Sequence, residues 1–252
     1  MTEPQKKILL YTAATPNGYK AAITLEELAI PYEVKKIDIT QLEQKEEWYL
    51  KINPNGRIPA IVDPNNNNFA VFESGALMLY LTDKYDKDHK ISYPQGSDLY
   101  WELVSWLFFQ NAGVGPMQGQ ANHFFRYAPE KIPYAISRYQ NETRRLYSVL
   151  EKRLEQNGDW LVGDRMTIAD IANFSWVNLA YFAGVEIKEF PKLEAWTERM
   201  KAREAVQRGL EIPKKYVVKD ITDPANLDEK AQEVSNWVLK GQENDSKKKY
   251  QL

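Results

Sequence analysis

The stretch ILLYTAATPNGYKAAITLEELA, residues 8–29, joins an apolar run to a helical pattern through a turn. The run Ile8 to Tyr11 is short and apolar, which is typical of a buried strand. After Pro16 and Asn17, alanine and leucine side chains recur every three to four residues, as on one face of an amphipathic helix. Because Pro31 cannot continue that helix, the stretch predicts a strand, a turn and a helix in that order.

The next segments extend this alternation of strands and helices. Residues 34–39, VKKIDI, predict a second strand, and the polar segment around Trp48 and Leu50 predicts a short helix. Residues 58–62 and 69–72 are β-rich and flank the turn DPNNNN, so they predict a hairpin. A helix follows from Ser74. The predicted order is β-α-β-α-β-β-α within about 85 residues.

From Leu99 onward the patterns are helical, over residues 99–124, 128–156, 167–182 and 190–209. Thr167 and Asp170 have the spacing of a capping box, which should start the third of these helices. The sequence thus predicts an α/β domain at 1–88 and an all-α domain at 96–212. The extension 213–252 should contain a helix starting near Asp223 and then become disordered.

Composition restricts the chemistry of the protein. The 252 residues include 33 basic and 35 acidic side chains, so the net charge of −2 favours neither nucleic acid nor an anionic membrane as partner. The absence of cysteine excludes disulfides, thiolate metal ligands and a thiol nucleophile from the protein itself, and the presence of two histidines disfavours a histidine-rich metal site. Any thiol chemistry must therefore come with the substrate.

No apolar stretch approaches the roughly 20 residues that span a bilayer, and MTEPQKKILLY lacks the apolar region of a signal peptide. We therefore expect a cytoplasmic protein without a membrane partner.

Two short motifs suggest recognition of a peptide-like ligand. Pro59, at the start of a strand, belongs at an edge or at a special turn, and a cis bond before it would leave the backbone of Ile58 free for a ligand. Glu73 and Ser74 stand at a helix N-terminus, where backbone N–H groups and the hydroxyl suit a carboxylate and Glu73 suits an ammonium. Together they fit an α-amino acid end, although Ser74 as a plain helix cap remains an alternative.

Asn17 stands at the start of the first predicted helix, where free N–H groups and the helix dipole favour an anion. Its amide adds donors, Thr15 adds a hydroxyl, and a thiolate at such a position would have a lowered pKa. An ordinary capped helix start remains the alternative interpretation.

Four motifs in this order resemble the glutathione transferase family: TPNGYKAAITLEEL (15–28), NPNGRIPAIVD (53–63), FESGALMLYL (72–81) and VGDRMTIADIANFSWVN (162–178). The resemblance extends over roughly residues 7–210. With Asn after Thr-Pro, the chain is similar to the fungal nitrogen-regulator type and the bacterial nu class.

The resemblance implies a thioredoxin-like N-terminal domain, an all-α C-terminal domain, a homodimer, and glutathione as co-substrate without a metal. It also implies one role in glutathione binding for each matching residue: Asn17 and Thr15 at the sulfur, Glu73 and Ser74 at the γ-glutamyl end, Ile58 before cis-Pro59 at the cysteinyl backbone, Arg57 and Gln44 at the glycyl end, and Arg138 across the dimer interface. Tyr11, which some classes use at the sulfur, lies inside the strand and is expected in the core.

The resulting hypothesis is an enzyme that directs the glutathione thiolate at small disulfides or electrophiles. The alternative is a non-catalytic glutathione-binding module that regulates protein partners or carries ligands. The second substrate should bind beside the glycine-rich, aromatic segment 99–124. His123 and Arg126 are candidates for contacting it, but solvated or structural roles are the favoured interpretation.

Overall fold

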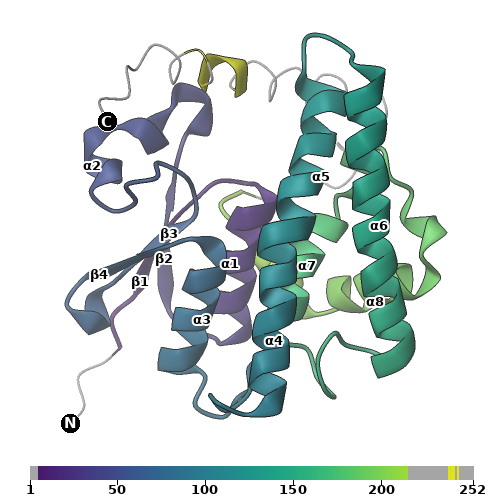
Figure 1. The fold of residues 1–252 in the computed structure, drawn as a ribbon. Coiled ribbons are helices and arrows are strands. Elements are labelled where there is room, and N and C mark those ends of the chain that lie inside the picture. The colour runs from purple at the N-terminus through teal and green to yellow at the C-terminus, as the bar shows by residue number, and fades with distance from the viewer. Residues whose placement is uncertain (1–4, 215–237, 242, 244–252) are drawn as a thin grey trace.

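The computed structural model describes residues 5–214, 238–241 and 243, and Figure 1 shows a sheet domain beside a larger helical domain. The four-stranded sheet has the order β2-β1-β3-β4, with β1 (Ile8–Thr12), β2 (Tyr32–Lys36), β3 (Ala60–Asp63) and β4 (Phe69–Phe72). Strand β1 is parallel to β2 and antiparallel to β3, with Leu10 opposite both Val34 and Ile61. The mixed sheet confirms the predicted α/β fold of this half.

Three helices complete the sheet domain: α1 (Pro16–Glu27), α2 (Glu47–Leu50) and α3 (Ser74–Tyr85). Buried side chains of α1 and α3 pack with Ile8 and Leu10, while Tyr49 of α2 packs with Ile37 and Ala60 in a separate cluster. Because alternate side chains of a strand point to opposite faces, α1 and α3 cover one face of the sheet and α2 lies against the other. The predicted order of elements is confirmed.

The second strand lies earlier than predicted. It ends at Lys36 rather than at residue 39, because the Asp38 carboxylate accepts hydrogen bonds from the backbone N–H groups of Thr40 and Gln41. These bonds turn the chain into a short 3₁₀ helix, Ile39–Gln41.

The helical domain contains α4 (Asp98–Phe109), α5 (Gly115–Asn122), α6 (Pro133–Asn157), α7 (Ile168–Val177), α8 (Pro191–Lys201) and α9 (Glu204–Leu210). The all-α character of this half is confirmed. The proposed domain boundaries at residues 88 and 96 fall in the connection between α3 and α4. Among the described residues, no helix has the length and apolar character needed to cross a bilayer.

Several helix limits differ from the prediction. The expected helix 99–124 is interrupted by a π-helical turn at Gln110–Val114, and a second π turn, His123–Tyr127, follows α5. The helix expected from residue 128 begins at Pro133, because a proline ring fits the first helical turn and disfavours helix in the residue before it. The pattern 190–209 is divided at Arg203, whose backbone is extended.

One more helix limit differs, and one predicted helix is not tested. The helix expected to reach residue 182 ends at Val177 and is followed by a 3₁₀ turn, Ala180–Ala183. The helix expected from Asp223 lies outside the described residues.

Helix α1 forms a large part of the contact between the two domains. Its residues Tyr19 and Ile23 belong to the large buried cluster of the helical domain. A Cβ atom on Gly209 of α9 would lie 2.8 Å from the backbone nitrogen of Ile23, so only glycine permits this approach. The same two helices are also joined by charge: buried Glu27 of α1 pairs with Arg203, the N-cap residue of α9, at 2.7 Å between Oε1 and Nε. Packing and charge thus fix the sheet domain against the helical domain.

The predicted capping box at the start of α7 is present and buried. Thr167 Oγ1 accepts from Ala169 N–H at 3.3 Å, and Asp170 Oδ2 accepts from Thr167 N–H at 2.9 Å. Asp170 Oδ1 also accepts from Leu161 N–H and from Trp196 Nε1–H. Although burial raises the pKa of Asp170, its hydrogen bonds favour the carboxylate and oppose that shift.

We predict that Asp170→Ala lowers the free energy of unfolding by at least about 3 kcal/mol, because several buried donors lose their acceptor. Urea denaturation measures this loss, with the exposed Asp88→Ala as the matched control. A loss no larger than that of the control would contradict the role of Asp170 in holding the α7 terminus.

Candidate functional site

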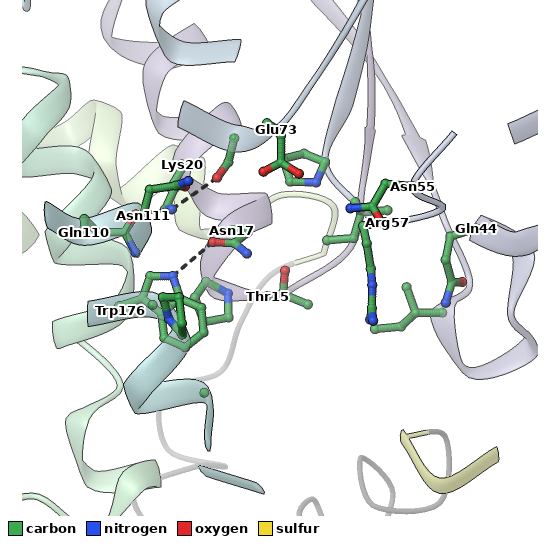
Figure 2. A pocket seen from close by; sticks show the side chains of 18 of the residues that line it. Thr15, Asn17, Lys20, Gln44, Asn55, Arg57, Glu73, Gln110, Asn111 and Trp176 are labelled. Atoms are coloured by element: carbon green, nitrogen blue, oxygen red, sulfur yellow. Dashed lines mark hydrogen bonds between the residues drawn. The ribbon is translucent and has the colours of Figure 1, made fainter. Parts of the chain in front are cut away.

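The candidate site is a cleft of about 920 Å³ between the two domains, within the size range of small-molecule sites. Its walls come from the N-terminus of α1, the segment before β3, the start of α3, and the α4–α5 region with α7. Figure 2 shows Asn17 near the middle of this cleft, with Trp176 and Gln110 on one side and Arg57 and Gln44 on the other.

The turn before α1 presents Thr15 and Asn17 to the cleft. Thr15 is the N-cap: its backbone is extended, and its Oγ1 accepts from Gly18 N–H at 3.2 Å. The hydroxyl proton of Thr15 therefore remains available to a ligand. Gly18 allows a close approach inside the protein, since a Cβ there would lie 2.2 Å from the carbonyl oxygen of Ala13. Asn17 is consequently not the cap but lies in the first turn, beside the free N–H groups.

Trp176 of α7 sets the orientation of the Asn17 amide. Trp176 Nε1 donates to Asn17 Oδ1 at 3.0 Å, which is marked by a dashed line in Figure 2. Because an indole N–H can only donate, it must face the amide oxygen, and the NH₂ group of Asn17 is left for another acceptor. The helical domain thus aims the donors of a side chain that belongs to the sheet domain.

The start of α3 presents Glu73 and Ser74. Glu73 occupies the N-cap position in a left-handed conformation, with φ of 66°, and its side chain is exposed and makes no capping bond. Ser74 is buried and is the first residue of α3, so the alternative of a Ser74 cap is wrong. Its hydroxyl instead accepts from Lys20 Nζ at 3.1 Å.

Lys20 was not singled out from the sequence, although it lines the cleft. It lies one turn after Asn17 on α1 and is 1% exposed. Its ammonium donates to Ser74 Oγ and to Gln110 Oε1, which comes from the π turn of the helical domain. Burial lowers the pKa of Lys20 to about 7, and the charge of Glu73 acts in the opposite direction.

The segment before β3 forms the opposite wall. The Ile58-Pro59 bond is cis, and both residues line the cleft together with Arg57. The backbone carbonyl of Arg57 accepts from Tyr49 Oη–H and from Asn53 Nδ2–H, each at 2.7 Å. These bonds anchor the segment while the Arg57 side chain stays exposed.

Gln44 also lines this wall. Its side chain is buried, and its Oε1 has no hydrogen-bond partner among the described residues. Buried polar atoms are normally paired, so a ligand at this position would complete the bonding of the Gln44 amide.

Two further candidates lie outside the cleft. Arg138 stands on α6 with a half-exposed side chain, 3.9 Å from Glu142, and does not line the cleft of its own chain. Tyr11 is partly buried and packs against Trp48 and Tyr49, as expected for a residue of the sheet core.

One wall of the cleft is aromatic. His123, Phe124 and Tyr127 from the second π turn line it, and burial lowers the pKa of His123, which favours a neutral ring. Arg126 donates to the carbonyl oxygen of Phe182 at 3.3 Å, which supports the structural role expected for it. No group of side chains able to hold a metal ion occurs among the described residues.

Chemically, the cleft offers separate surfaces for the parts of an extended, charged ligand. Glu73, Ser74 and the α3 N-terminus suit a zwitterionic amino acid end, and Arg57 with Gln44 suits a distant carboxylate. Asn17, Thr15 and the α1 N-terminus provide a third set of donors, for an anion, and Figure 2 shows Thr15 between Asn17 and Arg57.

The fold and cleft define a two-domain protein in which a thioredoxin-like sheet domain and a helical domain share one site. Family models for the glutathione S-transferase N-terminal and C-terminal domains match residues 15–84 and 126–204, respectively. The chain belongs to the glutathione transferase family.

Individual relatives support the fungal and bacterial subgroup that the sequence resembles. The disulfide-bond oxidoreductase YfcG of Escherichia coli is 42% identical over 207 residues, which cover 80% of this chain and 93% of YfcG. The protein URE2 of Candida albicans is 35% identical, with 82% of this chain and 71% of URE2 covered. A crystal structure of a glutathione transferase homologue from Lodderomyces elongisporus, with two glutathione molecules per subunit, is 46% identical. Its TM-score is 0.80, and the match covers 82% of this chain and 99% of that one.

We predict a pH-dependent contribution of Lys20 to stability. Its pKa is about 7 in the folded protein against an ordinary 10.5, so the unfolded chain binds more protons between these values. The free energy of unfolding should therefore rise with pH, relative to Lys20→Met, by up to roughly 1.4 kcal/mol per pH unit above about pH 7.5.

Urea denaturation of both proteins at several pH values measures this slope, and the exposed Lys192→Met provides the control. A difference that stays constant between about pH 7 and 10 would show that the Lys20 ammonium is not desolvated.

Proposed function

We propose that the protein is a glutathione-dependent transferase and disulfide reductase, which stabilises the glutathione thiolate and directs it at small disulfides or electrophiles. The observation that carries this proposal is the Asn17 amide, whose oxygen is bound by Trp176 and whose donors lie at the α1 N-terminus in the cleft. Since the chain contains no cysteine, the reactive sulfur must belong to the ligand.

In the proposed complex, Glu73 pairs with the ammonium of the γ-glutamyl end, and Ser74 with the α3 N-terminus binds its carboxylate. The backbone of Ile58, before cis-Pro59, pairs with the cysteinyl residue. Arg57 and Gln44 bind the glycyl carboxylate, and Asn17 with Thr15 faces the sulfur. In this assignment the NH₂ group of Gln44 donates to the carboxylate, and its unpaired Oε1 is left to accept from an N–H group of the ligand. Thr15 contributes its free hydroxyl proton.

The donors around the sulfur lower the pKa of the bound thiol, as helix N-termini do for cysteine. Thiolate nucleophilicity falls together with the pKa, so the best attacking thiol has a pKa near the ambient pH. A neutral amide and a hydroxyl suit this requirement, because they stabilise the thiolate less strongly than a cation would.

Disulfide reduction proceeds in two exchanges. The bound thiolate attacks one sulfur of the substrate disulfide, forms a mixed disulfide with it and expels the other half as a thiolate, which takes up a proton. A second glutathione thiolate then attacks the glutathione sulfur of the mixed disulfide, so that oxidised glutathione and the second substrate thiol are formed. Each glutathione supplies one of the two electrons.

We predict that Asn17→Ala reduces glutathione-dependent reduction of a small disulfide by about ten- to a hundredfold in kcat/KM, because a donor to the thiolate is lost. Steady-state kinetics on hydroxyethyl disulfide measure this loss, and conjugation to an electrophile is assayed in parallel. Trp176→Phe, which keeps an aromatic ring but lacks the indole N–H, should also reduce the rate, by a smaller factor.

Unchanged rates in Asn17→Ala would contradict the assignment of Asn17. Glutathione binding without turnover in the wild type would instead favour the alternative, a regulatory or ligand-carrying module.

We further propose that the protein is a homodimer in the cytoplasm. Four aromatic side chains stand 37–59% exposed on two elements, Phe69 and Phe72 on β4 and Trp101 and Phe108 on α4. Exposed apolar groups of this size are typical of an interaction surface, and a second copy of the chain would bury them. In such a dimer, Arg138 reaches the glutathione of the partner subunit.

We predict that light scattering finds twice the chain mass for the wild type, and that the double variant Trp101→Glu and Phe108→Glu is monomeric. Buried carboxylates without partners would destabilise the interface. Lys192→Glu on α8 controls for the added negative charge. A monomeric wild type, or a dimeric double variant, would contradict this surface.

A further inference from the structure

Lys20 is a buried cation beside the place proposed for the γ-glutamyl end. Its ammonium is enclosed by α1, the start of α3 and the π turn of the helical domain, with 1% of the residue exposed. Its acceptors among the described residues are the Ser74 hydroxyl and the Gln110 amide oxygen, and both are neutral.

A buried ammonium is costly when no anion accompanies it. Glu73 is the charged group that acts on Lys20, but its carboxylate is exposed, so solvent weakens the attraction. The ammonium form of Lys20 is therefore a positive charge that an anionic ligand would compensate.

The hydrogen bond to Ser74 shows where that anion would lie. Lys20 donates to Ser74 Oγ, which leaves the hydroxyl proton of Ser74 to donate to a ligand on its other side. Ser74, which also lines the cleft, and the free N–H groups of α3 thus offer donors to a ligand next to the ammonium.

We propose that Lys20 is the buried countercharge of the α-carboxylate of glutathione and acts on it through the hydroxyl of Ser74. This inference rests on the proposed function, because it assumes that glutathione occupies the cleft. Lys20 and Glu73 then form a pair of opposite charges that matches the carboxylate and ammonium of one α-amino acid. A γ-glutamyl group carries such a zwitterion, whereas a peptide with an ordinary N-terminal residue does not.

Ligand binding should also change the protonation of Lys20. The groups that face its ammonium are Glu73 and Ser74 from the α3 N-terminus and Gln110 from the helical domain, and Glu73 is the charged one among them. A carboxylate added at Ser74 stabilises the ammonium form, so the pKa of Lys20 rises above its free value of about 7 when the ligand binds. Near pH 8, binding therefore draws a proton onto Lys20.

The test compares two ligands that differ in the α-carboxylate alone. S-methylglutathione retains the complete γ-glutamyl group and has no titrating thiol. S-methyl-γ-aminobutyryl-cysteinylglycine retains the amine but lacks the carboxylate. Isothermal titration calorimetry measures the affinity of both ligands for the wild type and for Lys20→Met, in which the charge is replaced by an apolar chain of similar length.

We expect Lys20→Met to lose about tenfold or more in affinity for S-methylglutathione and less than about twofold for the analogue. An equal loss for both ligands would overturn the inference, because it would show that Lys20 is only structural. Failure of the wild type to bind S-methylglutathione at all would instead overturn the proposed function.

The wild type provides a second measurement that does not depend on the folding of a variant. Its preference for S-methylglutathione over the analogue should shrink by up to about tenfold per pH unit above pH 7, with proton uptake visible in buffers of different ionisation enthalpy. A preference that does not change with pH between about 6.5 and 9 would contradict the countercharge.

Discussion

The position of α1 between the two domains is the constraint on which the site depends. Gly209 of α9 lies against Ile23, and Gly18 lies against the carbonyl of Ala13, so the start and the middle of the helix are fixed by close backbone contacts. A side chain at either glycine would displace the helix. Because Asn17 and Lys20 stand on this helix, the packing of α1 also determines where the donors and the buried charge face the cleft.

The helical domain completes the site rather than only covering it. Trp176 binds the oxygen of Asn17, and Gln110 binds the ammonium of Lys20. A Cβ on Gly115 would lie 2.7 Å from Gln110 Nε2, so the glycine after the π turn leaves room for that amide. The Asn17 amide and the Lys20 ammonium of the sheet domain are thus oriented by side chains of the helical domain. The reactivity proposed for the glutathione sulfur therefore depends on how the two domains pack.

The sequence predicted the local features and missed those that depend on long-range packing. The order of strands and helices and the Thr167–Asp170 cap follow from short patterns, and the structure confirms them. Trp176 lies 159 residues from Asn17, and Gln110 lies 90 from Lys20, so no local pattern could join them. No local signal marked Lys20, because its neighbours on the same helix face include Asn17, Thr24 and Glu27, which are also polar. Hydrophobic periodicity likewise did not reveal the π turn at Gln110–Val114, because the segment 110–120 has few apolar side chains whose register could show the extra residue.

The central claim is that the cleft seats a thiolate that the protein itself cannot supply. A crystal structure with bound glutathione tests this claim most directly. The account predicts the sulfur within about 3.5 Å of Asn17 Nδ2 and near Thr15 Oγ1, with the γ-glutamyl carboxylate at Ser74. A sulfur beside Tyr11, or a glutathione bound outside this cleft, would contradict it.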